Sequence, residues 1–104
     1  MRTLLAASGF LLLLSSGARA QGDAKDIYSN KCAVCHGLDG AGKTMMGRKL
    51  KVANIRTVVG KHSAEVMIAV VQNGKGESMS AYGKDFTKDQ IKGIVEYMRS
   101  LAKP

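Results

Sequence analysis

The stretch KCAVCHGLDG, residues 31–40, holds the only two cysteines of the chain, Cys32 and Cys35, and a histidine directly after the second. A Cys-x-x-Cys spacing serves a structural disulfide, a redox-active dithiol, one corner of a zinc site or the covalent attachment of haem. These uses imply different folds and different compartments. The rest of the sequence has to decide among them.

The first twenty residues have the layout of a secretory signal peptide. A basic start at Arg2 precedes an apolar stretch from Leu4 to Leu14, and the segment ends in Ala18-Arg19-Ala20, an A-x-A cleavage pattern. The apolar stretch is shorter than the roughly 20 residues that a membrane span needs. We therefore expect residues 1–20 to be cleaved, leaving a soluble, exported domain of residues 21–104.

A domain of this size buries a limited fraction of its surface and often depends on a disulfide, a metal or another bound group. The only disulfide available would join Cys32 to Cys35. Such a small ring removes little entropy from the unfolded chain, because the benefit grows with loop length. The sequence therefore predicts a stabilising group of another kind.

The mature chain reads as helical, without clear strands, and its first helix leads into the cysteine motif. Residues 23–31 carry Ala24, Ile27 and Tyr28 at helical spacing. Residues 37–60 follow with several glycines and only weak periodicity around Leu50, which predicts an irregular segment.

Two further helices have clear start signals. Ser63 is placed to cap a helix that continues through Gln72 and stops at Asn73-Gly74. Thr87 and Gln90 form a capping box. It opens a last helix whose apolar positions recur along one side: Ile91, Ile94, Val95, Met98 and Leu101. We predict an all-α fold of three to four helices.

This helical pattern weighs against two of the four uses of the cysteines. A thioredoxin-type dithiol needs strands and a cis-proline, but the only proline is the terminal Pro104. Structural zinc needs four ligands in a tetrahedral array. The candidates are Cys32, Cys35, His36 and His62, and tetrahedral ligation by the adjacent Cys35 and His36 is awkward. A plain disulfide leaves His36 without a role.

Haem attachment accounts for all three residues of the motif together. Cysteines three apart on a helical turn can form thioethers with the two vinyl groups of the porphyrin, and His36 then lies below the iron. C-x-x-C-H is the signature of covalent c-type haem. The large apolar ring also supplies the stabilising group that a small domain lacks.

Three segments carry a resemblance to a known family: CAVCHGLDGAG at residues 32–42, GKGESMSAYG at 74–83 and TKDQIKGIVEYMRSL at 87–101. The chain resembles the small bacterial class I cytochromes c, which hold one haem between a histidine and a methionine. The resemblance implies a few helices wrapped around one covalent haem. It also implies that the first and last helices cross through Ala24 and Tyr28 on one and Ile94 and Tyr97 on the other.

The sixth iron ligand is less directly marked. Of the six methionines, Met79 lies in a glycine-bearing loop, and its place matches the axial methionine of the family. Met45 and Met46 follow His36 too closely, and Met67 and Met98 lie on apolar helix faces. His62 is the alternative ligand, although its place beside Ser63 favours a surface position. The family often has a proline where this chain has Ser80.

The charge of the chain bears on its partners. Without Arg2 and Arg19, the 16 basic residues become 14 against 8 acidic ones, a net charge of +6. Between residues 43 and 61 there are six basic residues and no acidic one: Lys43, Arg48, Lys49, Lys51, Arg56 and Lys61. This run is either a solvated loop that offsets the haem propionates or a docking face for an acidic redox partner.

These features predict an electron carrier rather than an enzyme. The carrier would be a periplasmic or otherwise exported monomer that cycles between Fe(II) and Fe(III) and serves redox protein partners. The alternative is a haem enzyme or a gas- or peroxide-responsive protein whose sixth ligand is labile. Nucleic acid is not an expected partner, because no aromatic residues are interleaved with the basic run.

Overall fold

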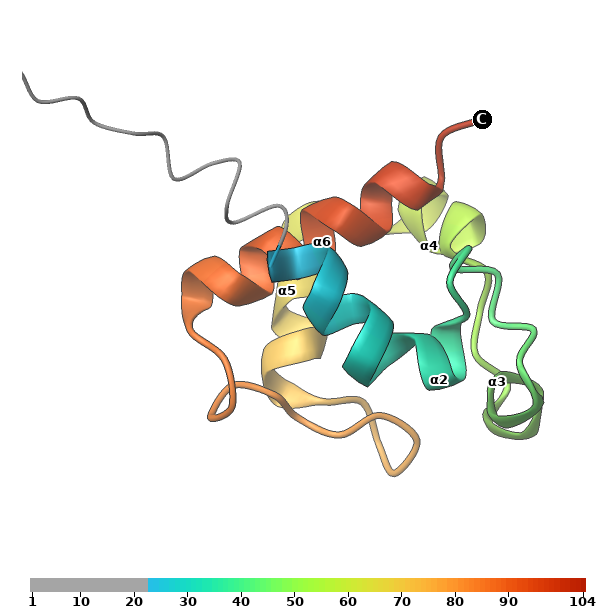
Figure 1. The fold of residues 1–104 in the computed structure, drawn as a ribbon, viewed down its shortest axis with the longest axis horizontal. Coiled ribbons are helices and arrows are strands. Elements are labelled where there is room, and N and C mark those ends of the chain that lie inside the picture. Colours follow the sequence, from blue (N-terminus) through green and yellow to red (C-terminus); the bar gives the residue numbers. More distant parts are fainter. Residues whose placement is uncertain (1–22) are drawn as a thin grey trace, which may run out of the picture.

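A computed structural model describes residues 23–104, and the predicted signal peptide, residues 1–20, lies outside the described residues. In the described part the backbone forms helices joined by loops (Figure 1). The only β pairing within residues 23–104 is an isolated antiparallel bridge between Lys75 and Met79. The all-α prediction is confirmed.

The N-terminal helix is continuous from residue 23 to the end of the cysteine motif, but it is not a regular α-helix throughout. Residues 23–27 are α-helical, η1 (Tyr28–Cys32) is one turn of π-helix, and α2 (Ala33–His36) completes the segment. The helix stops at Gly37, whose φ of 83° lies in the region that favours glycine. The motif histidine is thus the last residue of its helix.

Two short helices occupy the segment that the sequence analysis predicts to be irregular. They are α3 (Met45–Leu50) and α4 (Ile55–Lys61), so residues 23–104 hold more helices than the predicted three to four. Each has a side-chain cap at its start. The Thr44 hydroxyl accepts from the Gly47 N–H, and the Asn54 side chain accepts from the Arg56 N–H. Their apolar pattern is too short to show a period.

The last two helices begin where their capping residues predict. Ser63 caps α5 (Ala64–Asn73), which ends at Gly74. Thr87 and Gln90 form the capping box of α6 (Lys88–Leu101), with both reciprocal hydrogen bonds present. Within the described residues no helix is both long enough and apolar enough to cross a membrane.

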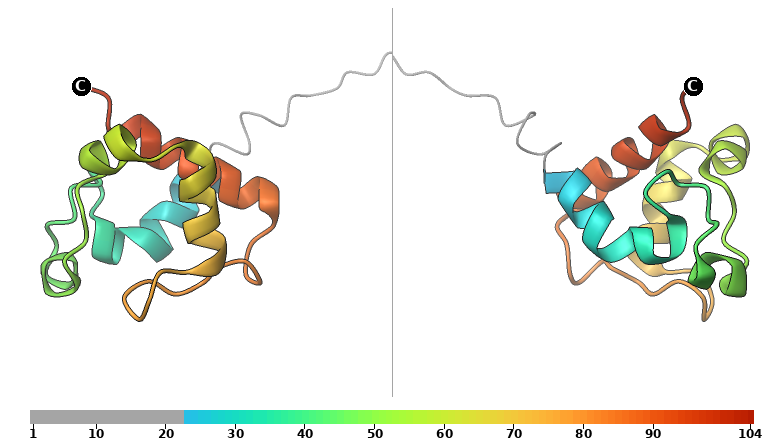
Figure 2. Two further views of the ribbon diagram at one scale, coloured as in Figure 1. Left: turned by 180° about the vertical axis from the view of Figure 1, so that it is seen from behind. Right: turned by 45° about the vertical axis from the view of Figure 1, so that its right-hand side comes forward.

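The core lies where α6 packs against the N-terminal helix, α4 and α5. In Figures 1 and 2 the red α6 passes beside the blue start of the N-terminal helix. The rings of Tyr28 and Tyr97 meet there with centroids 5.3 Å apart, and Ala24 is buried, as the family resemblance implies. The largest fully buried side chains are Tyr28, Ile91, Ile94 and Val95. Met67 and Met98 belong to this core, as predicted.

Candidate functional site

The three residues of the cysteine motif lie on one stretch of helix. Cys32 ends η1, while Cys35 and His36 belong to α2. Residues three apart on a helix lie on the same side, one turn from each other. All three side chains are half-buried, and Cys32 packs against the core. The motif therefore presents two sulfur atoms and one imidazole from a single turn of the chain.

The thiols are not joined to each other in this structure. Burial, with a smaller contribution from the neighbouring Cys35, raises the pKa of the Cys32 thiol to about 11. Cys32 therefore stays protonated near neutral pH. A protonated, half-buried thiol is the opposite of the activated thiolate that a thiol–disulfide oxidoreductase uses.

Burial also shifts the pKa of the motif histidine. The surrounding protein lowers the pKa of His36 below the ordinary value of histidine, because desolvation disfavours the charged imidazolium. The side chain is therefore neutral at physiological pH. A neutral imidazole has a free nitrogen lone pair, the form in which histidine binds a metal.

A short turn after His36 is held by several hydrogen bonds. The Tyr28 hydroxyl donates to the carbonyl oxygen of Gly37 at 2.5 Å, and the Gly40 N–H donates to the same oxygen at 3.1 Å. The Gly42 N–H donates to the carbonyl oxygen of His36 at 2.8 Å. Three hydrogen bonds thus hold the backbone on the C-terminal side of the histidine.

The α3 helix packs directly on this segment. The Thr44 hydroxyl donates to the carbonyl oxygen of Val34 at 2.7 Å and lies 3.3 Å from that of Cys35. Gly47 is buried against the Cys35 carbonyl, so closely that an added Cβ would collide with that oxygen. The helix that the sequence analysis missed is therefore a support of the cysteine motif.

Met79 approaches from the loop between α5 and α6, the orange segment of Figure 1. Its backbone pairs with Lys75, and its half-buried side chain packs against the same core as Cys32. Burial, followed by smaller contributions from Cys32 and Cys35, raises the pKa of the hydroxyl of Tyr82, three residues further. Met79, Tyr82 and Cys32 thus all pack against the same core.

His62 is placed differently. It is exposed, and it follows the last residue of α4. Among residues 23–104 no three His, Cys, Asp or Glu side chains gather as a metal site would require. The cysteine motif and Met79 together offer two thiols, a neutral imidazole and a thioether, a set that fits covalent haem with histidine and methionine on the iron.

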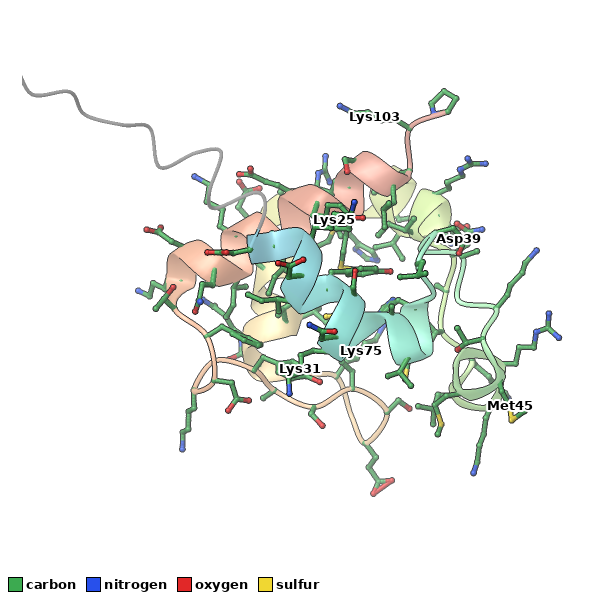
Figure 3. All side chains as sticks on the ribbon, in the orientation of Figure 1. Lys25, Lys31, Asp39, Met45, Lys75 and Lys103 are labelled. Atoms are coloured by element: carbon green, nitrogen blue, oxygen red, sulfur yellow. The ribbon has the colours of Figure 1, made fainter. Side chains whose placement is uncertain are left out.

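A surface groove flanks the motif on the side of α3. Its volume is about 370 Å³, and it is lined by Val34, Thr44, Met45, Met46 and Lys49. Met45 is 90% exposed and projects outward at the edge of the molecule (Figure 3). Val34, between the two cysteines, is 63% exposed. The apolar surface thus reaches from α3 to the cysteine motif.

Known sequences identify the family. Residues 19–98 match the family described as cytochrome C oxidase, cbb3-type, subunit III. Cytochrome c6 of Rippkaea orientalis is 34% identical over 96 residues, which cover 89% of this chain and 83% of that protein. Cytochrome c6 of a Synechococcus species is 31% identical over 98 residues, covering 94% and 79%. The chain belongs to the cytochrome c family.

A solved structure supports the same assignment for this cytochrome. The KustC0563 c-type cytochrome superposes with a TM-score of 0.71 at 27% identity, over 77% of this chain and 98% of that one. The protein is a small class I monohaem cytochrome c with covalently bound haem c. It is an electron-transfer protein rather than an enzyme, which confirms the prediction.

Two residues of the cytochrome's site escape sequence reasoning. Tyr28 is predicted only as a core residue at the helix crossing, yet its hydroxyl reaches Gly37. Thr44 has no predicted role, yet it caps α3 and bonds the cysteine helix. The only local signal for Thr44 is its place three residues before a glycine that is buried in the structure. No apolar periodicity indicates the hydrogen bond of Tyr28.

Proposed function

We propose that this cytochrome is exported and carries single electrons between redox proteins, with its haem attached through Cys32 and Cys35 and its iron held between His36 and Met79. The observation that carries the ligand assignment is the half-buried, neutral His36 on the same helical turn as two half-buried thiols. When bound, the haem would supply the Fe(II)/Fe(III) couple. The chain would supply the cysteines that attach the haem, the side chains that bind the iron and the apolar surroundings that keep water from the haem.

The thiol chemistry fits the attachment. Cys32 and Cys35 would hold the haem through thioethers, in which each sulfur gains a bond to a vinyl carbon and the thiol hydrogen goes to the neighbouring carbon, so no other reactant would be consumed. The raised pKa of Cys32 keeps that hydrogen on the sulfur until attachment. The spacing of the two thiols along one helical turn suits the two vinyl groups on neighbouring edges of the ring.

Met79 is the best-supported sixth ligand. Its side chain packs against the same core as Cys32, whereas Met45 and Met46 are exposed and Met67 and Met98 are buried in the core. A thioether favours Fe(II) and raises the reduction potential relative to a second imidazole. With His36 and Met79 both bound to the iron, no position would remain for a substrate, and electron transfer would require little rearrangement.

The export proposal rests on residues 1–20, whose pattern is that of a cleaved secretory signal. The periplasm is the compartment that suits a bacterial protein of this kind. Mass spectrometry of the secreted holoprotein tests it: a chain that begins at Gln21 and carries the mass of one haem supports the proposal. A product that retains residues 1–20 contradicts it.

The proposed partner is an acidic redox protein, and the cytochrome that it binds is a monomer. Lys43, Arg48, Lys49 and Lys51 are all exposed, and Lys49 lines the apolar groove of α3. A basic surface repels a second copy of a basic chain and attracts an acidic surface. The exposed apolar centre then gives contact area near the haem attachment, where short distances favour electron transfer.

Optical and near-infrared spectra of the purified holoprotein test the axial ligands. We expect low-spin bands and a weak sulfur-to-iron band in the near infrared. Met79→Ala should remove that band, while Met46→Ala and His62→Ala, which alter residues outside the core, should leave it unchanged. Persistence of the band in Met79→Ala would contradict the assignment. Binding of carbon monoxide to the unaltered ferrous protein would instead indicate an open sixth site.

A further inference from the structure

Tyr28 acts on both ends of the cysteine motif at once. Its backbone carbonyl oxygen accepts a hydrogen bond from the Ala33 N–H, which closes the π-turn just before Cys35. Its side-chain hydroxyl donates to the carbonyl oxygen of Gly37, directly after His36. One residue therefore bonds the chain directly after Cys32 and again directly after His36.

The geometry of the second bond is tight. The donor and acceptor oxygens are 2.5 Å apart, and the Tyr28 side chain is completely buried, so water does not compete for either group. Hydrogen bonds in such surroundings are stronger than in water, and a buried acceptor that loses its donor is costly. The ring itself is fixed by the ring of Tyr97. The hydroxyl is therefore held at one position.

The peptide that receives the bond is the one that reverses the chain. Gly37 has φ 83° and ψ 154°, outside the helical region, so the backbone turns sharply at the residue next to His36. The Gly37 carbonyl belongs to the peptide next to the one that joins His36 to Gly37, so a bond that holds this oxygen limits how the turn can move relative to His36. Apart from Tyr28, the Gly37 carbonyl receives only the longer bond from the Gly40 N–H among residues 23–104.

We propose that Tyr28 is a positioning residue for the axial histidine: its buried hydroxyl, by holding the Gly37 carbonyl, sets the orientation of the His36 imidazole toward the haem iron. The inference rests on the proposed ligation by His36. It differs from a role in packing alone, because packing depends on the ring and positioning depends on the hydroxyl.

The test compares two chemically identical changes in the holoprotein. Tyr28→Phe removes the hydroxyl that reaches Gly37, and Tyr97→Phe removes the hydroxyl of the ring that Tyr28 contacts. Within residues 23–104 the Tyr97 hydroxyl makes no hydrogen bond. Haem methyl resonances in the proton NMR spectrum of the ferric protein report the orientation of the axial imidazole, and voltammetry reports the potential.

We expect Tyr28→Phe to displace the haem methyl resonances and to shift the reduction potential, whereas Tyr97→Phe leaves both near those of the unaltered protein. Equal spectra and potentials in the two variants, even with a loss of stability in each, would overturn the proposal. The spectrum of the unaltered protein tests the proposed function separately. If that spectrum shows no histidine ligation, the proposed function is wrong, whatever the two variants show.

A second variant covers the case in which Tyr28→Phe does not take up haem. The chain has three tyrosines, so Tyr82→Phe/Tyr97→Phe leaves Tyr28 alone. Incorporation of 3-fluorotyrosine then makes only this hydroxyl a stronger donor, with almost no change in shape. A shift of the potential and of the haem methyl resonances relative to the unlabelled double variant supports the proposal. Identical values overturn it.

Discussion

Gly47 of α3 lies against the backbone carbonyl oxygen of Cys35, at a distance that leaves no space for a side chain. A Cβ built at Gly47 would also come within 2.5 Å of the carbonyl oxygen of Gly42. Both obstacles are backbone atoms, which cannot turn aside as a flexible side chain can. The close approach of α3 to the cysteine helix therefore depends on this one glycine.

Gly47→Ala should destabilise the holoprotein by about 1–3 kcal/mol, the usual cost of forcing extra atoms into a packed site. Gly60→Ala is the matched control. Gly60 lies within α4, and a Cβ there would meet nothing within 4 Å, so the same substitution should stabilise the helix by about 0.5–1 kcal/mol. Denaturant titration measures both. Similar effects of the two substitutions would contradict the packing argument.

Thr44→Val removes two interactions with almost no change in size. The N-terminal cap of α3 contributes about 1 kcal/mol, and the hydrogen bond to the Val34 carbonyl contributes about 1 kcal/mol more. Ser63→Ala removes only the cap of α5. We expect the free energy of unfolding to fall roughly twice as far in Thr44→Val as in Ser63→Ala. Equal losses would show that the bond to Val34 contributes nothing.

Alkaline pH should weaken the fold through Tyr28. Burial raises the pKa of its hydroxyl above the ordinary value near 10. Above that value the unfolded chain releases the proton while the folded chain retains it. The stabilisation is therefore complete below pH 10 and is lost as the pH rises beyond it, at up to about 1.4 kcal/mol per pH unit.

The measurement is the free energy of unfolding at pH 9, 10 and 11 for the unaltered protein and for Tyr28→Phe. Lysines titrate in the same range, so the difference between the two proteins isolates the tyrosine. That difference should shrink as the pH rises. A difference that stays constant across the range would rule out Tyr28 as the source.

The docking surface can be tested by charge reversal. Lys49 lines the groove beside α3, and Lys92 is an exposed residue of α6. Lys49→Glu and Lys92→Glu change the net charge equally. With a small acidic copper protein as the oxidant, we expect the second-order rate at low salt to fall roughly tenfold for Lys49→Glu, and much less for Lys92→Glu.

Stopped-flow measurement across ionic strength checks this prediction, because screening should bring the rates of the variants together. Met45→Ser should lower the rate by an amount that salt does not remove, since an apolar contact is not screened. Equal loss in the two charge variants would mean that net charge alone, and not the groove, attracts the partner.

Local signals account for the parts of the fold that the sequence predicts. Ser63 and the Thr87–Gln90 box mark the starts of α5 and α6, because a capping side chain bonds the backbone within its own turn. The cysteine motif is equally local. Its chemistry depends on residues that adjoin or are one turn apart, so the spacing predicts haem once the helical pattern of the chain has set aside the other uses of two cysteines.

The unpredicted parts depend on contacts between segments. The α3 and α4 helices are short, and α3 is held by Gly47 and Thr44 against the cysteine helix rather than by a period of apolar residues. The bond from Tyr28 to Gly37 spans a π-turn, which shifts the helical register. No pattern with a repeat of 3.6 residues brings these two positions together.

The π-turn at Tyr28–Cys32 also means that the helix holds one residue more than a regular α-helix would need between Tyr28 and Ala33. Ser29, Asn30 and Lys31 lie exposed within this turn. Deleting one of the three would let the bond from the Ala33 N–H to the Tyr28 carbonyl become the ordinary bond of an α-helix, which spans one residue fewer. The haem-binding face would then keep nearly the same direction relative to the face that meets α6, so the turn can absorb the loss of one residue.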